Sequence, residues 1–391
     1  MSFHDERREF EQELEAYYSR YPADLSAVTR KLDEENARHP AWSPCRRKAF
    51  LYEILAADCP IKVFRHFPFF FQFDVGKPRT DLGSGGLGGW LKDQPFGRQL
   101  SAEGVAWWRP CCESGLSLGW PVLDDNHHCG GTDNFLRHGV NGLLARVERR
   151  RATAGTDTER DLLDAMGAGL RSLVTLAGRF ADEAGRLAAN EPDPAIRRRL
   201  ERIAATARRS PAEPPATFFE AANMILFMRE VTQSLEANGI SILGHLDRLL
   251  WPYYERDFAA GRITRQEAKD LLGFLLALSD TRFGIRQGGA HVGTNTTVVI
   301  GGCDAAGAVV FNDVTRMILE LYDEERLVDP KLNARISRGH PAEYFDLLSR
   351  SMAAGGNSLC VFNDDVIIPA NVKMGKAVED CRLYVGGGCQ E

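Results

Sequence analysis

The last residues of the sequence place a thiol and a carboxylate beside a run of glycines. Gly386, Gly387 and Gly388 precede Cys389, and Glu391 follows the cysteine by two positions. Because glycine permits tight and unusual backbone angles, such a turn can hold a thiol close to a substrate. Glu391 is near enough along the chain to act as a general base in the same pocket. Taken alone, these residues are more typical of a terminal cysteine on a flexible tail than of a catalytic thiol. The choice between the two depends on the rest of the sequence.

A second group of reactive side chains is the segment DDNHHC at positions 124–129. Neighbouring histidine and cysteine side chains can bind zinc, but adjacent residues on one segment rarely point at one ion. Cys111 and Cys112 are also adjacent and equally unsuited to bind one ion together, so we predict no metal site. His127 or His128 can instead donate a hydrogen bond to a substrate hydroxyl or carboxylate, and a structural histidine fits the pattern about as well.

Polar residues also interrupt the largely apolar stretch at 238–247. Ser241 and Asp247 need mutual hydrogen bonds or a ligand there, because a buried polar group without a partner is unfavourable. We therefore name both as candidate substrate-binding residues, although an aspartate in such a setting is more often structural. The stretch at 287–291, which contains His291, has the same ambiguity.

The composition is that of an ordinary globular protein, with 391 residues, 44% hydrophobic and 26% charged. The formal net charge of −6 does not suggest the basic face that nucleic-acid binding requires. The charged first residues lack the apolar core of a signal peptide, and the longest apolar runs are too short or too charged to cross a bilayer. Nine cysteines without a CxxC spacing argue against a disulfide framework or a zinc ribbon. We therefore expect a cytoplasmic protein with reduced thiols that acts on small molecules, and no binding to nucleic acid or membranes.

Helical patterns dominate much of the chain before residue 280. Residues 1–60 and 134–209 carry charged faces and apolar residues at helical spacing, which predicts several amphipathic helices. Prolines within 210–215 end this region. Another helix is predicted from about Thr217 to Asn238, and the capping box of Thr264 and Glu267 predicts the start of a further one. The glycines at 83–89 lack the Lys-Ser/Thr of a phosphate loop and indicate a close-packed backbone loop rather than a nucleotide site.

Strands and helices alternate after residue 296. Residues 296–302, 332–336 and 358–362 predict strands. Asn312 is predicted to cap a helix that runs to about Leu327, and a further helix is predicted at about 341–354. This alternation predicts an α/β domain with mainly parallel strands.

Taken together and in order, these segments resemble the glycyl radical enzymes of the pyruvate formate-lyase family. Residues 215–272 are similar to the family's block P-x-T-F-x-E-A-L … S-x-G-R-x-D-Q … G-x-I-T-x-E-E-A. Residues 296–336 resemble V-T-I-G-G-x-D … P-x-L-x-x-R, and residues 355–391 resemble N-D-D … E-D-A-x-x-Y … G-C-V-E. The similarity is clear over 211–391 and weaker over about 120–145. The resemblance implies that residues 1–391 are the N-terminal part of one pyruvate formate-lyase-like domain.

The resemblance implies a ten-stranded α/β barrel of two five-stranded halves, of which this chain would form the first half-barrel with its surrounding helices. One loop inside that barrel carries a cysteine that becomes a thiyl radical. A second loop carries a glycine whose radical is installed by a radical-SAM activating enzyme. Cys389 matches the cysteine, and Glu391 matches the acid of the Cys-x-Glu motif of the dehydratase and lyase branches. His127 or His128 matches a family histidine.

The reaction implied by this resemblance is abstraction of hydrogen from a small substrate by a thiyl radical, with cleavage of a C–O, C–N, C–S or C–C bond. No bound metal or organic cofactor is implied beyond the protein radical. A formate acetyltransferase is the alternative, but that enzyme has two adjacent cysteines where this chain has Gly388-Cys389. Ile240-Ser241 stands where glycerol and diol dehydratases have His-Ser, and His245 replaces an arginine.

No segment of the sequence resembles the glycyl-radical motif Arg-Val-x-Gly-Tyr. We therefore expect this chain to be inactive alone and to need the second half-barrel, on the same gene product or on a companion chain. The resemblance also implies an activating enzyme as a partner and a homodimer. Two other hypotheses are a non-catalytic half-barrel that serves as a binding module, and a relative of the anaerobic ribonucleotide reductases, for which no nucleotide-binding module is recognisable.

Overall fold

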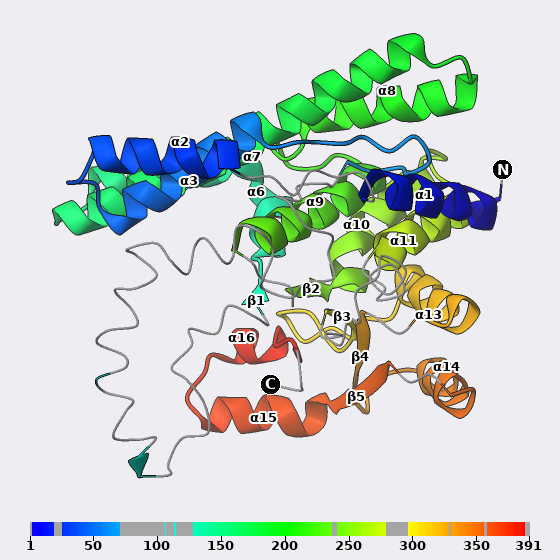
Figure 1. Ribbon diagram of the computed structural model, residues 1–391. Helices are drawn as coiled ribbons and strands as arrows, with labels where there is room; N and C mark the ends of the chain where they lie inside the picture. Colours follow the sequence, from blue (N-terminus) through cyan, green and yellow to red (C-terminus); the bar gives the residue numbers. More distant parts are fainter. Residues whose placement is uncertain are drawn as a thin grey trace.

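A parallel sheet lies at the centre of the protein (Figure 1). The structure, a computed structural model, describes residues 2–18, 26–70, 128–236, 241–278, 296–327, 330–355 and 358–387, together with residues 106, 113 and 114. The strands are β1 (His128–Cys129), β2 (Ser241–His245), β3 (Thr297–Gly301), β4 (Lys331–Ile336) and β5 (Leu359–Asn363). Their order in the sheet is their order along the chain, and every neighbouring pair is parallel. Such a sheet needs a crossover connection after each strand, which the helices supply.

Helices cover one face of this sheet (Figure 1). They are α9 (Phe218–Glu236), α10 (Leu246–Ala259), α11 (Arg265–Leu278), α13 (Asp313–Glu325) and α14 (Ala342–Ala353). Their apolar side chains share one core with Val298 and Ile300 of β3 and with Leu332 and Ala334 of β4. Because side chains alternate between the two faces of a strand, the intervening residues of β3 and β4 point to the opposite face.

A second core lies among the helices that precede the sheet. It involves α3 (Pro44–Asp58), α6 (Thr132–Ala152), α7 (Asp157–Asn190) and α8 (Pro194–Arg209). Thr156 and Glu159 form a capping box at the start of α7, and Asp193 caps α8. α1 (Phe3–Tyr18) packs on the sheet core through Phe10 and Leu14, while α2 (Ser26–Arg38) lies against α3.

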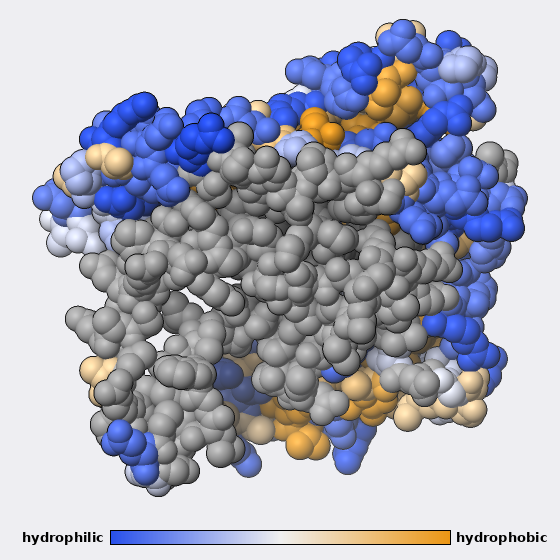
Figure 2. Space-filling view, in the orientation of Figure 1, coloured by the Kyte–Doolittle hydropathy of each residue, from blue (hydrophilic) through white to orange (hydrophobic). Residues whose placement is uncertain are grey.

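Two short helices, α15 (Asp364–Lys373) and α16 (Val378–Arg382), follow β5 on the side of the sheet away from α9 and α11 (Figure 1). Apolar side chains are exposed here: Val361 is 42% exposed, Val366 62% and Met374 76%. Figure 2 shows hydrophobic residues gathered at this lower edge of the molecule. β5 pairs only with β4 among the described strands, so no described strand lies on its second edge. A sheet edge of this kind beside exposed apolar residues is typical of a surface that another structural element covers.

The predicted α/β class with parallel strands is confirmed. The strands predicted at 296–302, 332–336 and 358–362 are β3, β4 and β5, and the side chain of Asn312 caps α13 as expected. Helices also occupy most of the described residues within 1–60, 134–209 and 217–238. The sequence did not predict β1, β2 or α10. The glycine loop at 83–89 and the stretch at 287–291 lie outside the described residues.

Candidate active site

Polar side chains gather on the sheet face that points away from α9 and α11. The strand registers place His245 level with Val299 and Val299 level with Asn333. One pleat further along, Arg335 lies level with Phe362. Residues at one level of neighbouring parallel strands point to the same face. His245, Asn333, Arg335 and Phe362 therefore share a face that is separate from the apolar helix-covered core.

A buried ion pair stands at the centre of this face. The Arg335 Nε lies 2.9 Å from the Asp364 Oδ1, and the Arg335 Nη2 lies 2.7 Å from the Asp364 Oδ2. The Arg335 side chain is fully buried, and the Asp364 side chain is 3% exposed. Two parallel charge-assisted hydrogen bonds fix the orientation of both groups. Asp364 is also the first residue of α15, where a negative charge is favoured by the helix dipole.

The same arginine holds the chain that returns toward the sheet after α16. Its Nη2 donates to the Arg382 carbonyl at 2.8 Å and its Nη1 to the Tyr384 carbonyl at 3.2 Å. The guanidinium carbon also lies 4.0 Å from the centre of the Tyr384 ring. The Tyr384 hydroxyl donates to Asp364 at 2.7 Å, and burial together with this carboxylate raises the pKa of Tyr384, so the phenol stays protonated. The ion pair therefore anchors the backbone just before the glycine run.

The first two residues of the glycine run lie directly against the strands. The Asn333 Nδ2 donates to the Gly386 carbonyl at 2.7 Å. A Cβ at Gly386 would lie 2.7 Å from the Phe362 ring, and a Cβ at Gly387 would overlap the Ile242 side chain. Both are closer than real Cβ contacts allow, so only glycine fits this approach. The segment that leads to Cys389 is thus held on the polar face, next to β2.

His245 is part of the same cluster and is almost completely buried. Its Nε2 lies 3.1 Å from the Tyr384 carbonyl and 3.4 Å from the Arg335 Nη1. Burial lowers the pKa of His245 to about 3, and the positive charges of Arg335 and Arg248 add to this effect. The ring is therefore neutral, and a proton on Nε2 makes the shorter contact a hydrogen bond. Its Nδ1 is buried without a partner among the described residues.

The structure brings the backbones of two predicted site residues together. His128 in β1 is the register partner of Ser241 in β2, and Cys129 is the partner of Ile242. Since Gly387 lies against Ile242, the glycine run approaches the strand ends that carry these two residues. Cys389, Glu391 and His127 lie outside the described residues, so their roles, like those of His128 and Ser241, stay predictions.

Asp247, the remaining candidate, is fully buried at the start of α10. Its Oδ2 accepts hydrogen bonds from the Gly301 amide at 2.7 Å and the Thr315 hydroxyl at 2.8 Å, and its Oδ1 accepts one from the Arg248 amide at 2.8 Å. Burial raises the pKa of Asp247 to about 6, although these hydrogen bonds oppose the rise. The contacts tie α10 to β3 and α13. They favour a structural role for Asp247 over substrate binding, the two roles that the sequence left open.

Sequence reasoning missed the Arg335–Asp364 pair and its contacts to Tyr384 and Asn333. A signal was available, because an arginine inside a predicted strand requires a buried acid if that strand is central. The acids that follow β5, Asp364 and Asp365, were the candidates nearest to such a strand end. Choosing between them required the orientation of α15, which the sequence pattern does not contain.

The cysteines whose side chains the structure describes are present as thiols and not in disulfides: Cys45, Cys59, Cys303, Cys360 and Cys381. Within the described ranges, no three histidine, cysteine or acidic side chains come together as a metal site. No helix in that part of the chain has both the length and the apolar character needed to span a membrane.

The chain matches a known protein family over more than half of its length. The family described as pyruvate formate lyase-like matches residues 105–391. The chain belongs to this family. Similar proteins include the isethionate sulfite-lyase of Nitratidesulfovibrio vulgaris, which is 30% identical over 243 residues, or 60% of this chain and 29% of the relative. The trans-4-hydroxy-L-proline dehydratase of Clostridioides difficile is 30% identical over 236 residues, or 59% of this chain and 30% of the relative.

Solved structures confirm that this pyruvate formate lyase-like chain has the fold of the glycyl radical enzymes. A glycyl radical enzyme from Archaeoglobus fulgidus matches 97% of the chain with a TM-score of 0.77 at 21% identity. The hydroxyproline dehydratase of Clostridioides difficile matches 97% with a TM-score of 0.72 at 19% identity. The chain spans 55% and 54% of these two structures, and about a third of the length of the relatives named above. The five parallel strands are thus part of a glycyl-radical-enzyme barrel, as predicted.

Proposed function

We propose that this chain supplies the cysteine-bearing half of a glycyl radical dehydratase or lyase that acts on a small organic substrate. The observation that carries the proposal is the anchoring of the segment before Cys389. Hydrogen bonds from Arg335 and Asn333 hold the carbonyls of Tyr384 and Gly386 on the polar face of the sheet. Relatives named as a sulfite-lyase and as a dehydratase support this class of reaction. Residues 1–391 then form part of one domain.

In the proposed reaction, a thiyl radical of Cys389 takes a hydrogen atom from a substrate carbon, so an S–H bond forms and a C–H bond breaks. Glu391 accepts the proton of the neighbouring polar group while the adjacent C–O, C–N, C–S or C–C bond breaks and its leaving group departs. The product radical then recovers the hydrogen atom from Cys389. A glycyl radical outside this sequence, installed by a radical-SAM activating enzyme, would generate and store the unpaired electron. Ser241 and His127 or His128 would bind the substrate, with Asp247 behind them.

A second half-barrel is the partner that we propose for the open side of this one. The exposed apolar residues Val361, Val366 and Met374 belong to β5 and to α15 with its C-cap, and no described strand pairs with the second edge of β5. Burying them against further strands and helices would be favourable and would close the substrate site to water. That half would carry the glycine radical, on the same gene product or on a companion chain, and the assembled enzyme would be a homodimer in a reducing cytoplasm.

The test is an anaerobic reconstitution of the 391-residue chain with an activating enzyme and a polypeptide that carries the Arg-Val-x-Gly-Tyr motif. Isethionate, trans-4-hydroxy-L-proline and glycerol serve as trial substrates, and product is measured by mass spectrometry. We expect turnover by the wild type and by Cys45→Ala, and none by Cys389→Ala or without the second polypeptide. Turnover by Cys389→Ala would refute the proposed chemistry. Turnover by the chain and the activating enzyme alone would refute the need for a second half.

A further inference from the structure

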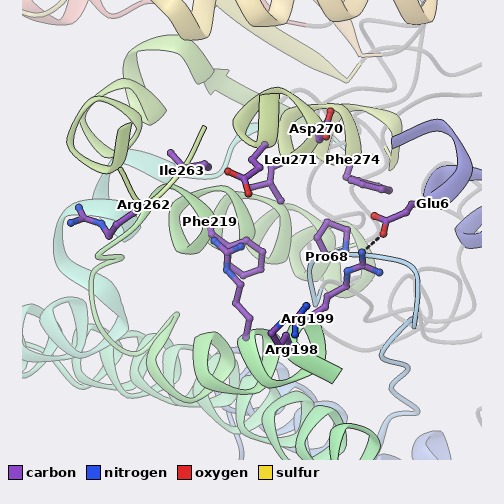
Figure 3. A pocket seen from close by; sticks show the side chains of 12 residues that line it. Glu6, Pro68, Arg198, Arg199, Phe219, Arg262, Ile263, Asp270, Leu271 and Phe274 are labelled. Atoms are coloured by element: carbon purple, nitrogen blue, oxygen red, sulfur yellow. Dashed lines mark hydrogen bonds and ion pairs between the residues drawn. The ribbon is translucent and has the colours of Figure 1, made fainter. Parts of the chain in front are cut away.

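A pocket of about 300 Å³ lies where α1, α8, α9 and α11 meet (Figure 3). Its apolar wall includes Phe219, Leu271 and Phe274. Four arginines line it as well: Arg198, Arg199 and Arg202 from α8, and Arg262 from the turn before α11. This pocket lies among the helices, and the proposed reaction does not use it.

Two of the four arginines have acidic partners. Arg199 forms an ion pair with Glu6, which Figure 3 shows as a dashed line, and also donates to the Arg65 carbonyl at 3.2 Å. The Arg262 Nη2 lies 2.7 Å from the Asp257 Oδ1. These two guanidinium groups therefore hold the walls of the pocket together, and the charge of each is balanced by an acid.

The acids that line the pocket are also engaged. Glu267 accepts hydrogen bonds from the Thr264 amide and hydroxyl, each at 2.8 Å. Asp270 accepts one from the Gln266 side chain at 2.7 Å, and burial raises the pKa of Asp270. Neither acid forms an ion pair with Arg198 or Arg202 in the described part of the chain. Among the described residues, Arg198 and Arg202 thus form no salt bridge, and Glu267 acts on Arg202 only through its charge.

Arg202 is held in a geometry that suits an incoming anion. Its guanidinium carbon lies 3.7 Å from the centre of the Phe219 ring. Stacking of this kind stabilises the cation through the ring face and limits its rotation. The N–H groups lie in the plane of the guanidinium, and no hydrogen bond from Arg202 to another described residue occupies them. A planar fork of free N–H donors matches the two oxygens of a carboxylate or phosphate.

We propose that this pocket binds a small organic oxyanion, a phosphate or carboxylate attached to an aromatic or branched apolar group. Arg202 would bind two of its oxygens with help from Arg198. The apolar body would lie against Leu271 and Phe274. A volume of about 300 Å³ is at the lower end of small-molecule sites, so it suits a single ring or a short branched chain.

Calorimetric titration of the 391-residue chain tests this proposal with three probes: phenyl phosphate, benzoate and inorganic phosphate. We expect phenyl phosphate or benzoate to bind, and whichever binds more tightly identifies the anionic group. Inorganic phosphate should bind about tenfold more weakly than phenyl phosphate because it lacks the apolar body. Equal binding of these two would overturn the proposed role of the apolar wall.

The matched variants are Arg202→Gln and Arg197→Gln, substitutions of two exposed arginines of α8, of which only Arg202 lines the pocket. Arg202→Gln should weaken binding about tenfold or more, since it removes a charge-assisted hydrogen-bond donor. Arg197→Gln should leave the affinity unchanged, and circular dichroism should show both variants to be folded. Absence of binding by both organic probes at 10 mM, or equal loss in the two variants, would overturn the proposal.

Discussion

The Arg335 guanidinium and the Asp364 carboxylate form a buried two-point ion pair that joins β4 to the first residue of α15. Arg335 donates further hydrogen bonds to the carbonyls of Arg382 and Tyr384, so one side chain connects β4, α15 and the segment before the glycine run. A change at this pair should therefore affect both the stability of the fold and the position of the proposed catalytic loop.

Removing one partner of this pair should be strongly destabilising. Arg335→Met leaves the Asp364 carboxylate buried without its cation, which should lower the free energy of unfolding by about 3–5 kcal/mol. Urea unfolding followed by circular dichroism measures the loss. The double variant Arg335→Met/Asp364→Leu should recover part of it, because no unpaired charge remains.

The matched control is the exposed pair of Arg316 and Glu343, which has the same two-point geometry with both distances at 2.8 Å. Because solvent screens that pair, Arg316→Met should change the stability by no more than about 1 kcal/mol. Equal effects of Arg335→Met and Arg316→Met would contradict the importance of the buried pair.

Glycine at position 386 should be required for the close approach to the sheet. The Cβ of Gly386→Ala would lie 2.7 Å from the Phe362 ring, so the segment or the ring must shift, at about 1–3 kcal/mol. Gly178→Ala in α7 is the control, since a Cβ there meets nothing within 4 Å. That control should stabilise the protein by about 0.5–1 kcal/mol through helix propensity. Thermal unfolding of both variants gives the comparison, and a neutral Gly386→Ala would contradict the packing.

Much of the fold was predictable because its signals are local. The β-branched run in β3 and the Asn312 cap of α13 each act within a few residues. β2 was missed because its sequence SILGH has no β-branched run, it contains Gly244 with a φ of 84°, and it gains its regular structure by pairing with β3. Local patterns do not show such pairing.

The candidate site was less predictable than the fold because its contacts join residues that are far apart in the sequence. Asp247 was noticed as a polar residue in an apolar stretch, and its burial confirms that environment. Arg335 and Asp364 are 29 positions apart, and they meet only because α15 turns back over β4. His128 and Ser241 are register partners only because β1 pairs with β2, and these two strands are more than a hundred residues apart in the sequence.

Asn333 should control how firmly the segment before Cys389 is held. Asn333→Leu keeps the approximate size of the side chain but leaves the Gly386 carbonyl without its 2.7 Å donor. The unsatisfied carbonyl should lower the free energy of local opening, which protects the backbone amides from exchange, by about 1–3 kcal/mol. Hydrogen exchange of a peptide that spans 383–387 measures this change. Asn371→Ala removes a comparable side-chain hydrogen bond within α15 and should leave that peptide unchanged, so equal exchange in the two variants would argue against the anchoring role of Asn333.

His245 should make the stability fall on acidification. Its pKa is lowered from 6.5 to about 3 in the folded protein, so its contribution is complete above pH 6.5 and is lost as the pH falls from there toward 3. Between pH 7 and pH 5 the loss should be about 2 kcal/mol, because the unfolded chain takes up the proton and the folded chain does not. His245→Gln should remove this part of the pH dependence, and His4→Gln, at an exposed histidine, should not. Urea unfolding at both pH values checks the difference, and identical slopes for wild type and His245→Gln would show that His245 is not held neutral.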